Sequence, residues 1–266
     1  MITVKIQNFT GYEPTGSNMT FTTFDAIMLA LDSARINNVK FEVYLGYVCD
    51  ALLDIDLKYK VDKLDAEFPE ADIGIWTKGI GINAHAETLA KAEFIVITLS
   101  LELVDGHSSH SDTSVLLDQY LADLLTFAKS FTRIIQVVLT LTDLEDNVSV
   151  DYVTKQLAEC ANVRVCLSNS QEFLSLLQDS TPYKDSDRFC DQIANEMSIS
   201  VDGFYDVCCA AEVDKSNVRQ SVYDTSIITH MFGESRLTNI NYIETNQDIP
   251  IHTCADCILL RTFGSI

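Results

Sequence analysis

The sequence has little glycine and proline, few basic residues and no long apolar run. Ten glycines and four prolines among 266 residues leave no GxGxxG, no GxxxxGK[ST] and no GxSxG motif. These absences exclude the dinucleotide-binding fingerprint, the P-loop and the α/β-hydrolase nucleophile elbow. No apolar stretch reaches the ~18 residues that a membrane helix needs, so no membrane association is predicted. The N-terminal segment MITVKIQNF also lacks the basic and long apolar regions of a secretory signal peptide.

Positive charge is scarce as well. The chain has 18 Lys and Arg against 39 Asp and Glu, which gives a formal net charge of −21, and no window concentrates the basic residues. Such a chain repels nucleic acid and anionic membranes, so direct nucleic-acid binding is disfavoured. The acidity either keeps the protein in solution or mimics a polyanion for a protein partner.

The eight cysteines are predicted to be reduced thiols of a cytoplasmic protein, because no secretory signal precedes them. One group of metal-ligand types stands near the C-terminus, at His252, Cys254 and Cys257. A single CxxC lacks the second pair that structural zinc sites use, so no metal and no cofactor are predicted. A zinc site remains an open alternative if other ligands complete the group in space, from His230 or the Cys208–Cys209 pair.

Strand and helix patterns alternate through most of the chain. Apolar, β-branched segments predict strands at residues 2–9, 39–45, 94–99, 134–141 and 163–168, with amphipathic helical windows between them. This alternation predicts an α/β fold with a parallel, doubly wound sheet. The polar segment 180–187 interrupts the rhythm. It predicts a junction between an N-terminal Rossmann-like lobe, residues 1–180, and a shortened C-terminal α/β lobe, residues 181–266.

Ligands of open parallel sheets bind outside the carboxyl ends of the strands, so the loops after the strands hold the candidate residues. The stretch TRIIQVVLTLTDLED is a buried strand that ends on Asp143. This carboxylate is either a general base or the N-cap of the next helix. In DGHSSHSDTS, His107 and His110 are either metal ligands, a proton shuttle or polar loop residues, and Asp112 or Thr113 is a candidate helix cap.

The order of these segments resembles the phage DNA glucosyltransferases of the GT-B type. The resemblance lies in ITVKIQNFTGYEPTGSN before a helix, and in AEFIVITLSLE leading through a long helix to TRIIQVVLTLTDLED. It implies two Rossmann-like lobes, with Asp143 in a Thr-Asp-hydrophobic triplet that deprotonates the acceptor hydroxyl. The later segment SVDGFYDVCCAAEVDKSNVRQS resembles the donor-binding half of the family, which implies that Lys215 and Arg219 hold the donor diphosphate. Gly11 and Asn18 would then line the acceptor side.

The resemblance predicts transfer of a sugar from a nucleotide sugar, such as a UDP-sugar, to an acceptor hydroxyl. Two other functions remain open. A non-catalytic acidic protein that binds a protein partner is favoured by the net charge, and by DVCCAA where the family has a glycine-rich turn. A nucleotide-processing enzyme of the deoxyribosyltransferase kind is similar in AEFIVITLSLELVDGHSSHSDTS, but Leu117 stands where its glutamate nucleophile belongs.

Overall fold

The computed structural model describes residues 1–10, 15–47, 49–100, 110–141, 147–169, 196–206, 220–233 and 237. The strands are β1 Ile2–Ile6, β2 Phe41–Leu45, β3 Asp72–Thr77, β4 Phe94–Ser100, β5 Ile134–Leu141, β6 Val163–Asn169, β7 Glu196–Ile199 and β8 Tyr205–Asp206. The α-helices are α1 Phe21–Ile36, α2 Leu57–Glu67, α3 Ala86–Leu89, α5 His110–Ser130, α6 Asn147–Leu157 and α9 Ile227–Phe232. Two 3-10 helices, η1 Ala51–Leu53 and η2 Ile82–His85, stand near the ends of β2 and β3.

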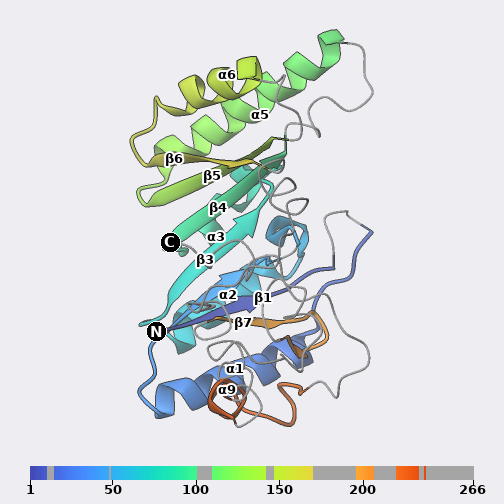
Figure 1. Cartoon of the computed structure of the whole chain (residues 1–266), viewed down its shortest axis with the longest axis vertical. Helices are drawn as coiled ribbons and strands as arrows, with labels where there is room; N and C mark the ends of the chain where they lie inside the picture. Colours follow the sequence, from blue (N-terminus) through green and yellow to red (C-terminus); the bar gives the residue numbers. More distant parts are fainter. Residues whose placement is uncertain are drawn as a thin grey trace, which may run out of the picture.

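The described strands form one sheet in the order β6-β5-β4-β3-β2-β1-β7-β8, spread from the top to the bottom of Figure 1. All neighbours pair in parallel except β7 and β8, which pair antiparallel. The predicted α/β class and the parallel sheet are therefore confirmed. The first six strands are added in one direction, so right-handed crossovers place their connecting helices on one face.

The predicted two-lobed, doubly wound arrangement is not confirmed. Strand β7 comes from the segment predicted to form the second lobe, yet it pairs with β1 at Thr3–Glu196 through Ile6–Ile199. One sheet thus contains strands from both predicted lobes. The predicted boundary at residue 180 falls in residues 170–195, outside the described part of the chain, and stays a prediction.

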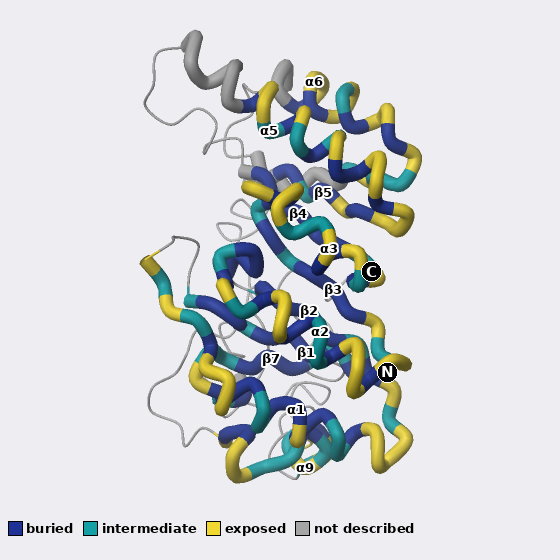
Figure 2. The backbone as a smooth tube through the Cα atoms, turned by 180° about the vertical axis from the view of Figure 1, so that it is seen from behind, coloured by how far each residue is buried: buried dark blue, intermediate teal, exposed yellow. Residues whose placement is uncertain are grey.

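The two faces of the sheet differ in chemistry because successive side chains of a strand point to opposite sides. One face is apolar and is packed into a single core with α1, α2, α5 and α6. Figure 2 shows the buried stretches of the backbone in dark blue. It includes Val4 and Ile6 of β1, and Val43 and Leu45 of β2. The opposite face holds the alternate residues of the same strands, many of them polar or aromatic.

The helix ends follow from local sequence. At the start of α1, the Thr20 side chain accepts a hydrogen bond from the Thr23 backbone N–H, as an N-cap does. The chain leaves α1 through Asn38, which has a φ of 55°, a left-handed conformation that asparagine tolerates. Helix α5 begins at His110, so Asp112 and Thr113 lie inside the helix and the prediction that one of them caps it is wrong.

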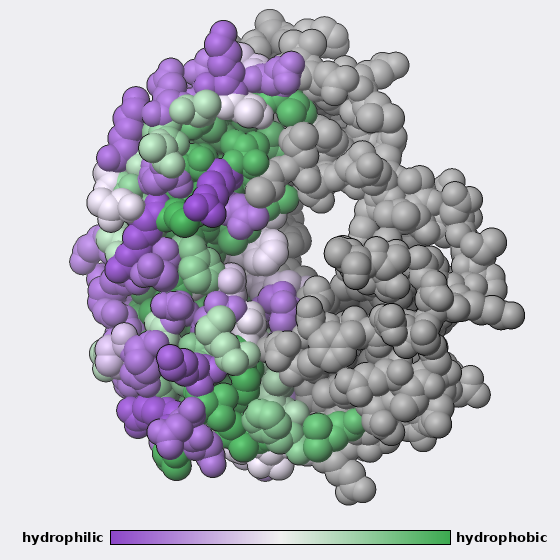
Figure 3. Space-filling model, turned by 60° about the vertical axis from the view of Figure 1, so that its left-hand side comes forward, coloured by the Kyte–Doolittle hydropathy of each residue, from purple (hydrophilic) through white to green (hydrophobic). Residues whose placement is uncertain are grey.

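On the face drawn in Figure 3, hydrophilic side chains lie along the outer edge of the described region, with apolar residues between them. Within the described ranges, none of the helices has both the length and the apolar character needed to cross a membrane.

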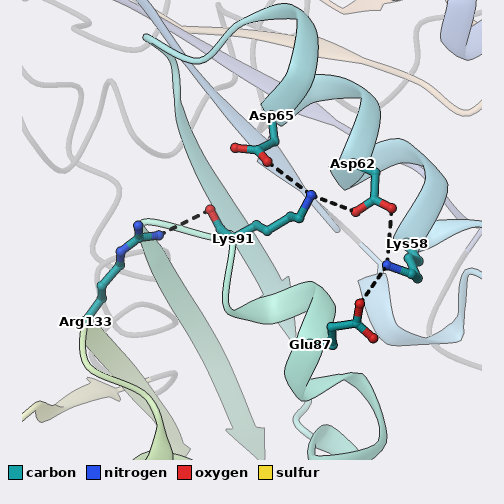
Figure 4. A network of polar contacts seen from close by, with 6 residues as sticks. All are labelled: Lys58, Asp62, Asp65, Glu87, Lys91 and Arg133. Carbon is teal, nitrogen blue, oxygen red and sulfur yellow. Dashed lines mark hydrogen bonds and ion pairs between the residues drawn. The ribbon is translucent and has the colours of Figure 1, made fainter.

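A network of exposed ion pairs joins α2, α3 and the starts of β4 and β5 (Figure 4). Lys91 lies 3.0 Å from Asp62 and 3.1 Å from Asp65, and Lys58 lies 3.2 Å from both Asp62 and Glu87. Asp62 is the shared acid, and its hydrogen bonds with Lys91 and then Lys58 lower the pKa of its carboxyl group. Because these side chains are solvated, each pair contributes little to stability.

We expect Asp62→Asn to reduce the free energy of unfolding at pH 7 by less than about 1 kcal/mol. A carboxyl group whose pKa is lower in the folded than in the unfolded chain stabilises the protein at pH values above its unfolded pKa. This contribution is lost as the pH falls through the folded pKa. The difference between wild type and variant should therefore shrink on acidification toward pH 3, and in high salt at pH 7. Urea denaturation at both pH values measures it, and a difference that persists in high salt would contradict this interpretation.

Candidate ligand-binding site

Most of the predicted site residues lie outside the described part of the chain. This holds for Asp143, Lys215, Arg219 and Gly11, and also for the group His252, Cys254 and Cys257. Asn18 is described: its backbone forms an antiparallel bridge with Phe9 in the loop after β1, and its buried Oδ1 has no hydrogen-bond partner among the described residues. In the ranges that are described, no group of three His, Cys, Asp or Glu side chains is arranged to hold a metal ion.

A buried polar network joins the loops after β1 and β2. The Asp54 carboxylate and the Lys60 ammonium are 2.7 Å apart, and neither side chain has any exposed surface. Asn8 Nδ2 donates to the same Asp54 oxygen at 2.7 Å, and Lys60 Nζ also donates to the Met19 carbonyl at 3.1 Å. The other Asp54 oxygen accepts from the Asp56 N–H. Both charges are therefore paired and hydrogen bonded, which their burial requires.

A second buried carboxylate joins the loops after β2 and β3. Asp50 Oδ1 accepts hydrogen bonds from the Thr77 hydroxyl at 2.6 Å and from the Leu52 N–H at 3.1 Å. Thr77 Oγ1 in turn accepts from the Gly79 N–H at 2.9 Å. The loops after the first three strands are thus fixed to one another at the carboxyl rim of the sheet, where parallel sheets bind ligands.

Cys49 belongs to this network as a neutral thiol. Its Sγ donates to Asn8 Oδ1 at 3.6 Å, and burial raises the pKa of the thiol to about 12. A thiol of that pKa is protonated at neutral pH, and the thiolate is the nucleophilic and metal-binding form. Cys49 therefore supports the rim and does not supply a reactive sulfur.

Beside this rim, the polar face of the sheet presents aromatic and charged side chains. We use "polar face" for the side opposite the helix-packed core, with Thr3, Lys5, Glu42, Tyr44, Gly74, Trp76, Phe94, Glu196 and Ser198. The strand register arranges them in rows: Ser198, Lys5, Tyr44, Gly74 and Phe94 are neighbours across five strands. The row nearer the amino ends of the strands is Glu196, Thr3, Glu42 and Asp72.

Glycine at position 74 allows two aromatic rings to meet over the sheet. The Tyr44 and Phe94 ring centroids are 4.7 Å apart. A Cβ at Gly74 would lie 2.3 Å from Phe94 Cε2 and 2.8 Å from Tyr44 Cδ1, so any side chain would displace the rings. Burial, followed by the charges of Glu42, Glu196 and Asp72, raises the pKa of Tyr44 to about 12. The phenol is therefore neutral and lies in a negative field.

A row of Trp76, Tyr47 and Lys5 crosses the polar face near the carboxyl ends of β1 to β3. The rings of Tyr47 and Trp76 are edge to face at 6.0 Å, and Lys5 Nζ lies 5.2 Å from the Tyr47 centroid. Lys5 is also ion-paired to Glu196 at 2.6 Å. Both rings are partly exposed. Together these groups offer an aromatic surface at one end and a cation at the other.

The sequence interpretation missed the buried carboxylates Asp50 and Asp54 of the rim. It also missed the row of Trp76, Tyr47 and Lys5. It named no candidate residue in the segment that follows the predicted strand at residues 39–45. Ligands of parallel sheets bind at the loops that follow the strands. Applied to the strand at residues 39–45, this rule would have pointed to Asp50 and Asp54. No local signal marks the row of Trp76, Tyr47 and Lys5, because only the strand register brings these residues together.

Solved structures with the same fold cover nearly the whole chain. A crystal structure of BtrN in complex with AdoMet and 2-DOIA matches with a TM-score of 0.56 and 13% identity, over 92% of this chain and 88% of BtrN. An open conformation of BtrN matches with a TM-score of 0.55 and 11% identity, over 94% and 90% of the two chains. Streptococcus suis SuiB bound to S-adenosylmethionine matches with a TM-score of 0.51 and 13% identity, over 98% and 71%. No protein-family model and no curated protein sequence matches the chain.

These findings contradict the predicted glycosyl transfer from a nucleotide sugar and the predicted UDP-sugar partner. The fold is shared with proteins solved with S-adenosylmethionine. The roles predicted for Asp143, Lys215 and Arg219 belonged to that reaction, and these residues lie outside the described part of the chain. The resemblance to the phage DNA glucosyltransferases stays a prediction from the sequence.

Proposed function

We propose that the chain binds S-adenosylmethionine, or a closely related S-adenosyl compound, against the polar face near the carboxyl ends of β1 to β3. The observation that carries this proposal is the row of Trp76, Tyr47 and Lys5 beside the hydrogen-bonded rim. A nucleobase stacks on exposed aromatic rings, and each such contact contributes about 1–3 kcal/mol. A sulfonium cation is attracted to aromatic faces, as other cations are.

The charge of the polar face supports this ligand over an anionic nucleotide. Burial is the main cause of the raised pKa of the Tyr44 phenol, and the charges of Glu42, Glu196 and Asp72 raise it further. Lys5 is the cation paired with Glu196. A ligand with a sulfonium and an ammonium group is attracted by this field, whereas a nucleoside diphosphate is repelled. BtrN and SuiB share this fold and were solved with S-adenosylmethionine. By this analogy of fold, S-adenosylmethionine is the cationic adenosyl compound to test.

The fixed rim supports binding in a second way. A site whose loops are already held in place loses less conformational entropy when it takes up a ligand. The contacts of Asp50, Asp54 and Lys60 hold the loops after β1, β2 and β3 before any ligand binds. The rim therefore holds the backbone segments that carry Trp76 and Tyr47.

Ligand binding is testable through stability. S-adenosylmethionine at about 100 times its Kd should add about 2.7 kcal/mol to the free energy of unfolding, and UDP-glucose should add nothing.

Trp76→Ala should weaken binding by about 1–3 kcal/mol through loss of stacking. Tyr152→Ala is the matched control, since Tyr152 is a partly exposed aromatic residue on α6, away from the polar face. Thermal denaturation and calorimetry measure both effects. Stabilisation by UDP-glucose, or none by S-adenosylmethionine, would refute the proposal.

A further inference from the structure

Two neighbouring side chains of the polar face have donors that the described structure does not use. Ser198 is 4% exposed, and its Oγ has no hydrogen-bond partner within the described part of the chain. Ser198 stands beside Lys5 in the register of β7 and β1, so the two side chains share a face. Buried polar atoms nearly always have a partner, so an unpaired hydroxyl here calls for an explanation.

Lys5 also has hydrogen-bond donors that the described structure does not use. It is 9% exposed, and its ammonium group carries three N–H donors. One donates to Glu196 Oε2 at 2.6 Å, and the Tyr47 ring lies 5.2 Å away on another side. The ammonium group therefore has donor capacity left next to the Ser198 hydroxyl. Two adjacent buried donors are complementary to an oxygen acceptor, and a carboxylate offers two such oxygens.

We infer that Lys5 and Ser198 form a subsite for the carboxylate of the ligand's amino-acid group. This rests on the proposed function, in which the adenine stacks at Trp76. Trp76 is on β3, two strand spacings from Lys5 on β1 and two residues beyond its register partner Gly74, which gives a backbone separation of about 12 Å. An extended S-adenosyl compound spans such a distance between its base and its amino-acid end.

The surrounding charges favour an amino-acid group over a phosphate in this subsite. Glu196 is bonded to Lys5, and Glu42 and Asp72 lie in the same row of the sheet as Glu196. A dianionic phosphate would be repelled by these three carboxylates. A zwitterionic group places its carboxylate against Lys5 and Ser198 while its ammonium group faces the acids.

The test compares S-adenosylmethionine with 5′-methylthioadenosine, which keeps the adenosine but lacks the amino-acid group. Calorimetry on the full chain should show S-adenosylmethionine binding about fivefold more weakly to Ser198→Ala, the loss of one hydrogen bond. Lys5→Met should weaken it by tenfold or more, the loss of a charged hydrogen bond. Methylthioadenosine should bind wild type and both variants equally. Ser198→Ala should leave the melting temperature unchanged, because the hydroxyl has no hydrogen-bond partner in the described ranges to lose.

Thr126→Val is the matched control. Thr126 is on α5, on the helix-packed side of the sheet, and its hydroxyl already donates to the Ala122 carbonyl at 2.7 Å, so its loss should not change either affinity. Unchanged S-adenosylmethionine binding in Ser198→Ala or in Lys5→Met overturns the subsite but leaves the proposed function standing. Equal losses for both ligands also overturn it, because the subsite would then not read the carboxylate. If neither ligand binds wild type, the proposed function falls and the subsite with it.

Discussion

Lys60→Met should lower the free energy of unfolding by about 3–5 kcal/mol, because it leaves a buried carboxylate without its cation. The Asp54 and Lys60 side chains are fully buried and 2.7 Å apart. Methionine fills much of the same volume but cannot donate to Asp54 or to the Met19 carbonyl. Asp54 would keep Asn8 Nδ2 and the Asp56 N–H as donors, which stabilise its charge only in part.

Lys58→Met is the control for this prediction. Lys58 is on the same helix, but its side chain is 54% exposed and its partners Asp62 and Glu87 are at the surface. Its replacement should change the free energy of unfolding little, because ion pairs between solvated side chains contribute little to stability. Urea denaturation of both variants measures the difference. A loss at Lys60 as small as the one at Lys58 would mean that solvent reaches the pair, and the fixed-rim argument would fail.

A second variant separates the charge from the geometry. Asp54→Asn combined with Lys60→Met removes both charges and keeps an amide oxygen for the Asp56 N–H. This double variant should regain part of the stability lost in Lys60→Met, because no uncompensated charge is left in the interior. The buried pair is thus a costly way to stabilise a protein, and its position indicates why it is there. It fixes the loops after β1 and β2 at the rim where we propose that the ligand binds.

The sequence predicted the regular part of the fold well. The continuous apolar runs at residues 94–99 and 134–141 are β4 and β5, which lie side by side in the sheet. The helical spacing after Thr23 and the long amphipathic window ending at Ser130 are α1 and α5. These elements could be predicted because each one's burial is visible in its own residues, as a continuous apolar run or as periodicity.

The segment around Glu196 shows where local pattern fails. The window FCDQIANEMS reads as helical, but Glu196–Ile199 is strand β7. The edge of β1 offers this segment a parallel ladder, and Met197 and Ile199 reach the core from it. Pairing and burial in a sheet override weak local preference, and neither is visible in a four-residue window.

The candidate site could be predicted only in part for a related reason. Lys5 and Glu196 are 191 residues apart in the sequence, so their ion pair is a product of strand order. Lys60 lies in a charged helical window and has the appearance of a surface residue, yet it is completely buried. The rule that ligands bind at the carboxyl rim gives the region. The register of the sheet then determines which side chains meet there.

Gly46→Ala should be among the most damaging single changes at this rim, with a loss of about 3–5 kcal/mol from backbone strain and overpacking. Gly46 ends β2 with a φ of 91°, and its N–H donates to the Ile6 carbonyl at 3.1 Å. A Cβ there would lie 2.1 Å from the Trp76 carbonyl oxygen and 2.8 Å from the Ala51 Cβ. The backbone of β3 would have to move, and Trp76 with it.

Gly81→Ala separates the two causes, because Gly81 has a φ of 71° but a Cβ added there would meet nothing within 4 Å. Gly81→Ala should lower the free energy of unfolding only by the cost of placing alanine in a left-handed backbone conformation, about 1–2 kcal/mol. Urea denaturation should therefore show a clearly larger loss for Gly46→Ala than for Gly81→Ala, and equal losses would show that the close approach to Trp76 does not matter.

Since the clash displaces Trp76, Gly46→Ala should also weaken S-adenosylmethionine binding at temperatures where the variant is folded, whereas Gly81→Ala should not. This second difference connects the geometry of the rim to the proposed ligand, because a purely structural glycine would change stability alone.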